Sequence, residues 1–349
     1  MDFLEENIKQ GIAEQATPGV AYSVITGDQV VTGAVGSKTY ANPEDKVTAQ
    51  SLYDIASLTK VLVVVTLVSK LIDKGVIKPN DPLKKYLPRF KYDDVTINSL
   101  LCHMSGLPAD LVGKEIVSRD EILDQVYAAE KEYETGTKIV YSDLGFILLG
   151  EMISQIYGKP LNEVAEEEIF KPLKMTSTGY LPTDKKSCVP TEQTESRGLV
   201  CGVVHDEKAC SLGGVAGNAG VFTNAHDLTN FVSMVLNNGV FEGKQFLSKE
   251  IIDLWFEPMV REQNERTDRL RSWCWIVGYN RLVSEKNRNM ISFNGFTGPS
   301  ISIDREKGLG IVLLANRVHP TRDNTKYTAV RKTLTDSIYR ELKLDEPTR

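Results

Sequence analysis

Residues 54–65 read DIASLTKVLVVV and place Ser57 three positions before Lys60, at the start of a long apolar run. A run of valines is typical of a buried strand, which would send the two side chains to different places. The whole stretch, TKVLVVVTLVSKLIDKG, instead spans about four helical turns and ends in basic residues followed by Gly75, which is a helix-stop signature. It is also longer than an ordinary strand. We therefore predict a buried helix, with Ser57 at or near its N-terminus and Lys60 one turn further along the same side.

This pair would be chemically useful, because a serine hydroxyl is a poor nucleophile until a base takes its proton. A lysine held beside it in a dry site is expected to lose part of its preference for the charged form. The helix N-terminus adds free amides and positive potential, which favour oxygen anions that form there. The S-x-x-K spacing occurs once here, and roughly one match is expected by chance in a chain of this length. An ordinary helix cap followed by a surface lysine is therefore the alternative interpretation.

The overall composition excludes several classes of function. Of the 349 residues, 41% are hydrophobic and 25% are charged, which is ordinary for a globular protein with a large core. A net charge of −6 offers no basic face to phosphate groups, so we expect no nucleic-acid partner. The longest apolar run, VLVVVTLV, is too short to cross a bilayer, and residues 1–10 lack the features of a signal peptide. The chain as given is predicted to be soluble and cytoplasmic, with a trimmed signal peptide left open.

The five cysteines are predicted to be reduced thiols, because their number is odd and none stands in a CxxC pair. They are Cys102, Cys188, Cys201, Cys210 and Cys274. Cys188, Cys201 and Cys210 could be imagined as a zinc site with His205, but the usual paired ligand spacings are missing. The sequence therefore predicts loop and core thiols, with no metal and no cofactor.

Strand patterns gather at the two ends of the chain. Residues 3–15 have helical spacing, and GVAYSVI and DQVVTGAVG flank the turn Thr26-Gly27-Asp28 as a β-hairpin. Near the C-terminus four strand-like stretches precede a closing helix, TAVRKTLTDSIYRELKL; these stretches are CWIVGYNRLV, RNMISFNG, SISIDREKG and LGIVLLANR.

The middle of the chain has mostly helical periodicity. Helices are predicted over 119–132, 144–157, 161–169, 226–238 and 248–257. Asn224 and Ser248 precede the last two as residues that commonly cap helices. We therefore expect a β sheet built from both ends of the chain with a helical region inserted between them, and a site in the cleft where they meet.

A second stretch with chemical potential is VYSDLGFILLGEMI, residues 140–153. Tyr141 and Ser142 precede an apolar helix, so both can project from a loop at its start. Asp143 could cap that helix, which is its structural interpretation. In the functional interpretation, Tyr141 approaches Ser57 and Lys60 from the helical region, and its phenol acts as a general acid or base.

A third stretch is SFNGFTGPSISID, residues 292–304, in which glycines interrupt a strand. Gly295 and Gly298 would weaken a strand interior, so their presence suggests the close approach of a ligand or of backbone. A strand beside a serine could also lend a backbone N–H to an oxyanion hole. A simple bulge or hairpin turn is the alternative.

Together these stretches resemble the serine penicillin-recognising family, which comprises class C β-lactamases, low-molecular-weight penicillin-binding proteins and the related β-lactamase-fold esterases. The resemblance runs over nearly the whole chain. It is carried by DIASLTK, LLCHMSGLP (100–108), IFKPLKMTSTGY (169–180), VHDEKACSLGGVAGNAGVFTNAHDL (204–228) and NRVHPTRDN (316–324).

The resemblance implies a β-lactamase/transpeptidase-like fold of mixed α/β (α+β) class, with an antiparallel sheet flanked by helices and a mainly helical domain. Residues 1–80 and 265–349 would form the sheet domain and 81–264 the helical one, with the active site between them. Ser57 would attack a carbonyl to give an acyl-enzyme, while Lys60 and Tyr141 share the proton transfers. The backbone amides of Ser57 and Phe296 would form the oxyanion hole, and water or another acceptor would release the acyl group.

Two departures from the family pattern bear on the substrate. The family's Tyr-x-Asn motif reads Tyr141-Ser142-Asp143, so a carboxylate replaces the amide that binds substrate. An alignment of Ser142-Asp143 with a class A type S-D-N motif is broken by Leu144, and we favour the tyrosine alignment. The family's Lys-Thr-Gly or His-Thr-Gly aligns with Phe293-Asn294-Gly295, which removes a cation from the predicted substrate-binding strand. We therefore expect a neutral or weakly polar ester or amide substrate.

The histidines are predicted to be structural. His103 in LLCHMSGLP has a hydrogen-bonding role by resemblance, His205 and Asp206 could line the rim of the cleft, and His319-Pro320 is a chain turn. The main hypothesis is a serine hydrolase that acts on a small molecule or short peptide, with the oligomeric state open. A non-catalytic ligand binder or sensor on the same fold is the rival, and acyl transfer to an acceptor other than water is a third possibility.

Overall fold

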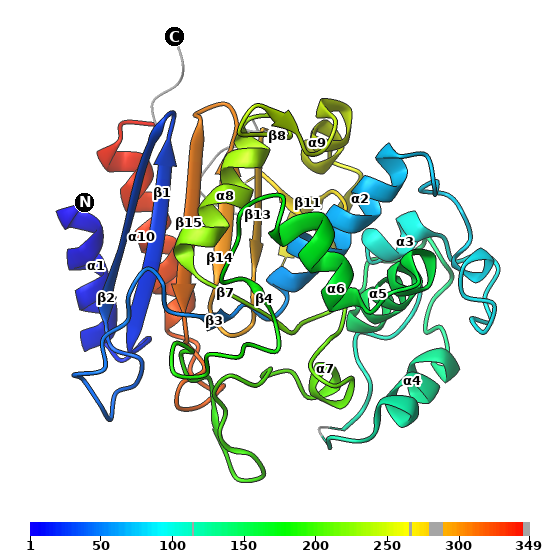
Figure 1. Ribbon diagram of the computed structural model, residues 1–349, viewed down its shortest axis with the longest axis horizontal. Coiled ribbons are helices and arrows are strands. Elements are labelled where there is room, and N and C mark those ends of the chain that lie inside the picture. Colours follow the sequence, from blue (N-terminus) through cyan, green and yellow to red (C-terminus); the bar gives the residue numbers. More distant parts are fainter. Residues whose placement is uncertain (114, 265–266, 279–288, 345–349) are drawn as a thin grey trace.

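The main sheet of the protein is built from both ends of the chain. The computed structural model describes residues 1–113, 115–264, 267–278 and 289–344. Within them, eight antiparallel strands run in the order β10-β11-β12-β13-β14-β15-β1-β2 (Figure 1). Their bounds are Val260–Asn264 (β10), Thr267–Arg271 (β11), Ile276–Val277 (β12), Met290–Asn294 (β13), Ser300–Asp304 (β14), Leu309–Ala315 (β15), Gly19–Thr26 (β1) and Gln29–Gly36 (β2). The sheet predicted from the two ends is therefore confirmed.

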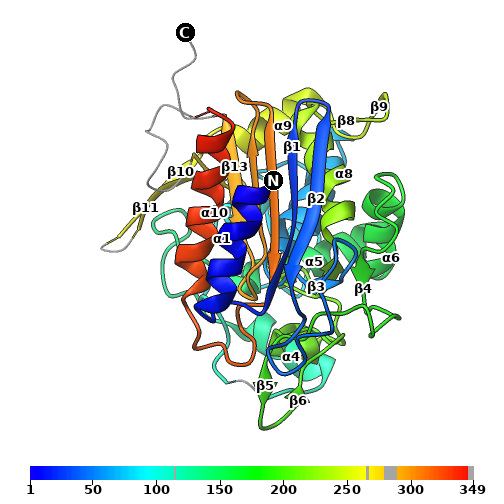
Figure 2. The same ribbon diagram turned by 90° about the vertical axis from the view of Figure 1, so that its left-hand side faces the viewer.

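Helices from both ends cover one face of this sheet. Helix α1 (Asp2–Ala13) and helix α10 (Tyr327–Glu341) lie side by side in front of the strands in Figure 2. Leu4 and Ile8 of α1 are buried against Leu334 of α10 and the outward face of the sheet in a separate apolar cluster. Burial of this cluster is what holds the two termini of the described chain together.

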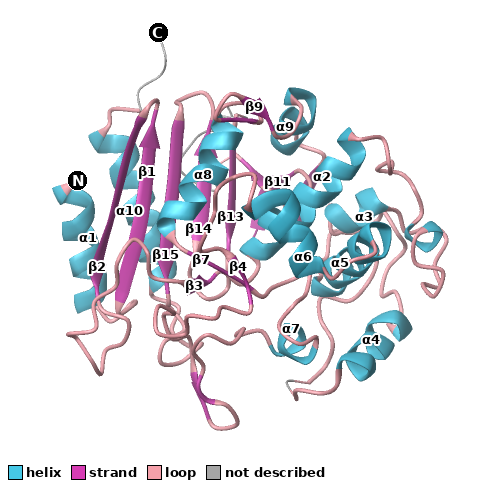
Figure 3. Ribbon diagram, in the orientation of Figure 1, coloured by secondary structure: helices cyan, strands magenta, loops and turns pink. Residues whose placement is uncertain are grey.

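The opposite face carries the inserted helices (Figure 3). Helix α8 (Ala225–Leu236) packs directly on β1, β14 and β15, and Thr229 Oγ1 donates to Ser23 Oγ at 2.7 Å. The remaining helices are α2 (Thr66–Asp73), α3 (Ile97–Leu101), α4 (Arg119–Ala128), α5 (Asp143–Tyr157), α6 (Leu161–Ala165), α7 (Glu207–Ser211) and α9 (Lys249–Phe256), with the short helical turns η1 (Lys60–Val65), η2 (Leu83–Lys85) and η3 (Glu166–Phe170). Short ladders are made by β3 (Tyr53–Asp54), β4 (Gly179–Tyr180) and β7 (Val221–Thr223), by β5 (Gln193–Thr194) and β6 (Gly198–Leu199), and by β8 (Val240–Phe241) and β9 (Lys244–Gln245).

All five helices predicted in the middle of the chain are present, with ends shifted by a few residues. Asn224 and Ser248 cap α8 and α9, because their side chains accept hydrogen bonds from the amides of Asp227 and Ile251. The segment predicted over 161–169 is α6 followed by the π-helical turn η3.

The stretch DIASLTKVLVVV starts a buried helix, as predicted. The residues from Val61 to Leu67 have no exposed surface, and the helix continues through α2 to Asp73. Its first part, η1, is π-helical rather than α-helical, a geometry that is frequently found at functional sites. Ser57 lies in the turn just before the helix, and its carbonyl accepts from the Lys60 amide at 3.0 Å.

The β10–β11 hairpin has no counterpart among the predicted strands. It is rich in charged residues and is tied by the cross-strand pairs Arg261–Asp268 and Glu262–Arg269, at 2.8 and 2.7 Å. Of the strand predicted for CWIVGYNRLV, the structure has Ile276–Val277, and 279–288 lie outside the described residues. The domain boundary at 264/265 stays a prediction, and β10 begins before it at Val260.

Candidate active site

Ser57 is held in a turn that other parts of the chain fix in place. Ala56 has a φ of +45°, a conformation that side-chain-bearing residues rarely adopt. Its amide donates to Asp54 Oδ1 at 2.8 Å, and the other oxygen of Asp54 accepts from the His205 amide at 2.7 Å. Since Asp54 is almost fully buried, these bonds anchor the backbone immediately before Ser57.

Lys60 is fully buried, and its ammonium group has three acceptors. Nζ lies 2.9 Å from Ser57 Oγ, 3.0 Å from the carbonyl oxygen of Asn218 and 2.6 Å from Asp143 Oδ1. The contacts with Ser57 and Asn218 are hydrogen bonds, and the contact with Asp143 is an ion pair. The structure therefore brings the predicted pair Ser57 and Lys60 into direct contact and adds two partners.

The charge state of Lys60 differs from the sequence-based expectation. Burial by itself lowers the pKa of Lys60, but the Asp143 carboxylate and the nearby Tyr141 outweigh it, so that the pKa is raised above its ordinary value. The expectation that a dry site would weaken the charged form of this lysine is wrong here. A carboxylate from a distant helix stabilises the ammonium, and Lys60 is protonated in the resting site.

Tyr141 completes the group of titratable side chains around Ser57. Its hydroxyl is hydrogen-bonded with Ser57, and Lys60 Nζ lies 5.1 Å from the centre of its ring. Burial raises the pKa of Tyr141 to about 12, although the Lys60 ammonium opposes this shift. The predicted approach of Tyr141 to Ser57 and Lys60 is thus present in the structure, which favours the tyrosine alignment over the S-D-N alternative.

The start of α5 delivers Asp143 to Lys60. Ser142, rather than Asp143, caps the helix, since its Oγ accepts from the Gly145 amide at 3.4 Å. The suggestion that Asp143 caps α5 is therefore wrong, and its carboxylate is available to Lys60 instead. The Ser142 amide donates to Nδ1 of His103 at 3.1 Å, and burial lowers the pKa of His103 well below its ordinary value. His103 is a neutral acceptor that positions this loop, which agrees with its predicted hydrogen-bonding role.

The end of β13 lies against the backbone that precedes Ser57. A Cβ at Gly295 would lie 2.3 Å from the carbonyl oxygen of Ile55, so this position requires glycine. Thr297 Oγ1 donates to the carbonyl oxygen of Asp54 at 2.7 Å. The close approach predicted for Gly295 is therefore an approach of backbone. These two contacts hold the chain on either side of Phe296 against the backbone that precedes Ser57. The role of the Phe296 amide in an oxyanion hole stays a prediction.

Phe293 and Asn294 precede this turn on β13 and differ in burial. Phe293 is 3% exposed, and its ring packs against Tyr141 and Trp275. Asn294 is partly exposed and pairs in register with Ser300 of β14. The strand thus places an apolar side chain, rather than a cation, next to Tyr141.

Two residues of the site, Asn218 and Asp206, were not predicted to contact the catalytic pair. A Cβ at Gly217 would lie 2.0 Å from the carbonyl oxygen of Phe146, so the glycine-rich loop fits closely against α5 and presents Asn218 to Lys60. Asp206 Oδ1 accepts from Asn218 Nδ2 at 3.1 Å, and burial, with a contribution from Asp143, raises the pKa of Asp206. The glycine-rich stretch 213–220 was the available signal for this loop.

A third residue missed by sequence reasoning, Arg271 of β11, approaches Tyr141 from the sheet. Its guanidinium carbon lies 5.9 Å from the centre of the Tyr141 ring, and its side chain is 3% exposed. Nε donates to Glu262 at 2.6 Å and Nη1 donates to the carbonyl oxygen of Cys274 at 2.9 Å. The β10–β11 hairpin therefore supplies a buried cation near the place where Phe293 offers none.

His205 and His319 are held in structural networks. His205 Nε2 lies 2.9 Å from Glu192 Oε2, and Arg322 Nε donates to the same oxygen at 2.6 Å. His319 Nδ1 lies 3.0 Å from the carbonyl oxygen of Thr191. His205 also stacks on Phe296, whose side chain is 48% exposed. The ring of Phe296 therefore lies partly at the surface, with the buried ring of His205 stacked against it.

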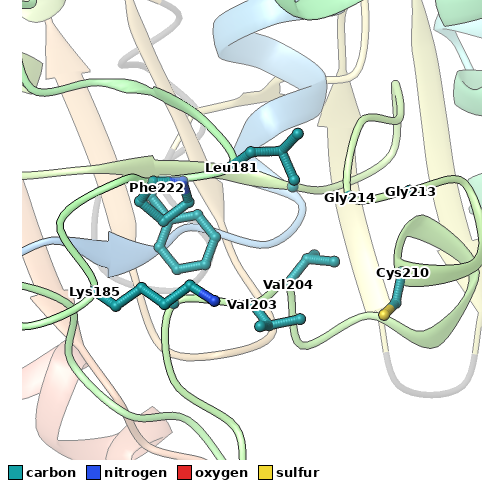
Figure 4. A pocket seen from close by; sticks show the side chains of 11 residues that line it. Leu181, Lys185, Val203, Val204, Cys210, Gly213, Gly214 and Phe222 are labelled. Carbon is teal, nitrogen blue, oxygen red and sulfur yellow. The ribbon is translucent and has the colours of Figure 1, made fainter.

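A pocket of about 330 Å³ lies beside the glycine-rich loop (Figure 4). It is lined by Leu181, Pro182, Lys185, Gly202, Val203, Val204, Cys210, Gly213, Gly214, Gly220 and Phe222. Its lining does not include Ser57, Lys60 or Tyr141. In Figure 4 the side chains of Lys185 and Cys210 lie at opposite ends of the labelled residues. Because most of the lining residues are apolar, Cys210 lines a largely apolar pocket.

In residues 1–113, 115–264, 267–278 and 289–344, no group of three or more His, Cys, Asp or Glu side chains is arranged to hold a metal ion. Over the same ranges, no helix has both the length and the apolar character needed to span a membrane.

The chain belongs to the beta-lactamase family, whose family model matches residues 4–335. The N-acetylmuramyl-L-alanine amidase of Bacillus subtilis (strain 168) is 29% identical over 362 residues, covering 91% of this chain and 80% of that protein. A protein of Escherichia coli O157:H7 named "Putative D-alanyl-D-alanine carboxypeptidase" is 30% identical over 357 residues, covering 88% of this chain and 81% of that one. The crystal structure of a β-lactamase/D-alanine carboxypeptidase from Pseudomonas syringae matches with a TM-score of 0.77 at 20% identity, covering 99% of each chain.

These similarities confirm the predicted family and the β-lactamase/transpeptidase-like fold, with its antiparallel sheet and mixed α/β class. They also indicate that the chain is an enzyme, a hydrolase of the serine acyl-enzyme type.

Proposed function

We propose that the protein hydrolyses an ester or amide through an acyl-enzyme on Ser57. The observation that carries the proposal is the contact of Ser57 Oγ with Lys60 Nζ at 2.9 Å. The Tyr141 hydroxyl is hydrogen-bonded with the same serine. A nucleophile within hydrogen-bond reach of proton-transfer groups is the arrangement that covalent catalysis requires.

In this mechanism Ser57 Oγ attacks the substrate carbonyl, and the carbonyl oxygen becomes an oxyanion. The backbone amides of Ser57 and Phe296 are the proposed donors to that oxyanion. Lys60 and Tyr141 move the proton from Ser57 to the leaving group, and a water molecule then releases the acyl group by the reverse sequence.

The proposed substrate is a small molecule or short peptide without a strong requirement for a carboxylate beside β13. Phe293 supports this preference, since it places a buried ring at the position where the family resemblance implies a lysine or histidine. The names of the two relatives, an amidase and a carboxypeptidase, support amide cleavage. We therefore propose peptidase- or esterase-like activity in preference to efficient β-lactam hydrolysis.

Intact-mass spectrometry after incubation with a penicillin and, separately, with p-nitrophenyl butyrate tests the proposal. The wild-type chain is expected to gain the mass of the acyl group, and Ser57→Ala is expected to gain none. Ser196→Ala, at an exposed serine on the β5–β6 loop, serves as the matched control and should react as wild type does. Absence of an adduct on the wild type with both reagents, or an adduct on Ser57→Ala, would contradict the proposal.

Phe293 also motivates a second candidate, a ligand binder or sensor that keeps the fold but does not turn over substrate. Such a protein would be acylated once per chain and then stay acylated. Following the adduct over time separates the two, because a hydrolase returns to its original mass while a sensor does not. Addition of an alcohol or amine during the same experiment would reveal acyl transfer, as partitioning of the product.

A further inference from the structure

The ion pair between Lys60 and Asp143 gives the site a carboxylate that contacts the lysine directly. We propose that Asp143 is a positioning residue in a Ser57–Lys60–Asp143 relay: it accepts a proton from Lys60 Nζ while Lys60 accepts the proton of Ser57. The inference rests on the proposed role of Ser57 as nucleophile and adds how that nucleophile is activated.

The hydrogen bonds of Lys60 explain why a further acceptor is needed. Lys60 carries its full complement of three N–H groups as an ammonium, so the nitrogen has no lone pair to offer to Ser57. Lys60 can take the serine proton only if it gives up one of its own. Of its partners, Asn218 contributes a carbonyl oxygen and Ser57 is the group to be deprotonated. Asp143 is the partner with a basic oxygen.

Burial favours this transfer when substrate is bound. Lys60 has no exposed surface, whereas the Asp143 side chain is 20% exposed. The Asp143 side chain is therefore partly in contact with water, while its Oδ1 atom, which faces Lys60, is buried. A substrate that covers Asp143 removes that water, and in a dry site a neutral amine and carboxylic acid are less costly to bury than two charges.

The proton and electron movements balance without any further reagent. The Ser57 Oγ–carbon bond forms as the carbonyl π electrons move to oxygen, the serine proton passes to Lys60, and one Lys60 proton passes to Asp143. When the intermediate collapses, the bond to the leaving group breaks and its electron pair takes a proton from Lys60, which regains one from Asp143. Deacylation repeats these steps with water in place of serine.

Other titratable groups face the pair from several elements. Tyr141 lies in the loop before α5, Cys274 lies between β11 and β12, and Asp206 precedes α7. Burial raises the pKa values of Tyr141 and of Cys274 to about 12, so both stay neutral at acidic and neutral pH. Asp206, whose pKa burial raises, is a further carboxyl group that faces the pair.

Two more groups lie in the outer part of the cluster. His103, after α3, has a pKa that burial lowers well below its ordinary value, and Arg271 of β11 supplies a guanidinium near Tyr141. The pH dependence of serine activation is therefore expected to report a carboxyl group.

The test measures the pre-steady-state release of p-nitrophenol from p-nitrophenyl butyrate between pH 4 and pH 10 (about the span from carboxylate to amine titration). This leaving group needs no proton, so the rate reports nucleophile activation alone. Wild type should reach its plateau at neutral pH. Asp143→Asn should lose about 10²- to 10⁴-fold at neutral pH, and its rise should move to alkaline pH because Lys60 itself must then lose a proton. Asp143→Glu should keep the wild-type shape at a reduced rate.

One control variant, one variant of the neighbouring carboxyl group Asp206 and a stability measurement separate the relay from a general effect of charge or folding. Asp94→Asn makes the same substitution in a Lys–Asp pair away from Ser57, where Asp94 lies 2.6 Å from Lys131, and should leave the profile unchanged. In Asp206→Asn the acid limb of the profile, which is the pH range over which the rate falls on the acidic side, should stay where it is in wild type. Thermal unfolding of each variant shows whether it is folded.

Three results would overturn the relay: an Asp143→Asn profile that superimposes on wild type, a wild-type rate that rises only at alkaline pH, or an acid limb that moves in Asp206→Asn alone. Failure of the proposed function is distinguishable, since it would appear as a wild-type chain that releases no p-nitrophenol and carries no adduct.

Discussion

Phe293 packs against Tyr141 with the ring centroids 6.4 Å apart and an interplanar angle of 25°. Trp275 meets Phe293 edge-on, also at 6.4 Å. The cations near Tyr141 come from elsewhere, with Lys60 Nζ 5.1 Å and the Arg271 guanidinium carbon 5.9 Å from its ring centre. Position 293 thus contributes packing to a site in which two buried cations already have partners.

Restoring a cation at this position is expected to destabilise the protein. In Phe293→Lys a buried ammonium would lie near Lys60 and Arg271 without a carboxylate of its own, at a cost of about 3 kcal/mol in the free energy of unfolding. Phe293→Leu keeps the site apolar and should cost less than about 1.5 kcal/mol. Urea unfolding measures both, and equal values for the two variants would contradict the prediction.

Removing the Lys60 ammonium is expected to abolish acylation. In Lys60→Met, Ser57 loses its proton-transfer partner, and the acylation rate with p-nitrophenyl butyrate should fall by about 10²- to 10⁴-fold. Lys70→Met is the matched control, because Lys70 lies further along the same helix and pairs with Glu168 at 3.4 Å. A Lys60→Met chain that acylates as fast as the Lys70→Met chain would show that Lys60 has no part in catalysis.

The glycine-rich loop is expected to tolerate no side chain at Gly217. A Cβ there would lie 2.0 Å from the carbonyl oxygen of Phe146, so Gly217→Ala should move the loop and draw the Asn218 carbonyl away from Lys60. We expect a loss of about 1–3 kcal/mol in stability, as for other overpacked sites, together with slower acylation. Gly179→Ala is the control, since a Cβ there meets no atom within 4 Å. Similar melting temperatures and rates for the two variants would contradict this account.

Asp81 is expected to make stability depend on pH in the acidic range. Hydrogen bonds from the Tyr86 hydroxyl and the Lys78 amide, with Lys85 nearby, hold the pKa of Asp81 at about 2, below its ordinary value. A depressed folded-state pKa stabilises the protein above the unfolded pKa near 4, and the effect is lost as pH falls towards 2. Asp81→Asn should therefore lower the free energy of unfolding by about 1 kcal/mol at pH 7, with solvent screening included. Urea titrations should show this difference shrinking between pH 4 and pH 2, and a difference constant with pH would count against it.

Much of the fold could be predicted from the sequence, and so could the part of the site that is formed by residues close together in the chain. The length of the apolar run after Ser57 and the stop signal at Gly75 were enough to distinguish a helix from a strand, although not to show its π-helical first turns. Ser57 and Lys60 lie three residues apart in one helical segment, so their contact follows from helix geometry alone. Asn224 and Ser248 likewise cap their helices by accepting hydrogen bonds from amides within one helical turn.

What sequence reasoning missed depends on contacts between distant segments. The charge state of Lys60 is set by Asp143, 83 positions away, and Asn218 reaches the same nitrogen across 158 positions. No local pattern shows that Ser142 takes the capping role and releases Asp143. The β10–β11 hairpin was missed because charged cross-strand pairs stabilise it, and these leave no alternation of apolar and polar residues.

The placement of β1 between β2 and β15 has a consequence for how the protein is made. Val20 pairs with Ala315, so strand β1 must wait for the synthesis of 295 further residues before its second neighbour exists. Until then the edge of β1 that later pairs with β15 is open, and such edges invite pairing with other chains. Contacts between positions so far apart in the chain also slow folding. The main sheet is therefore completed late, and chaperone protection of the early hairpin should raise the yield of folded protein.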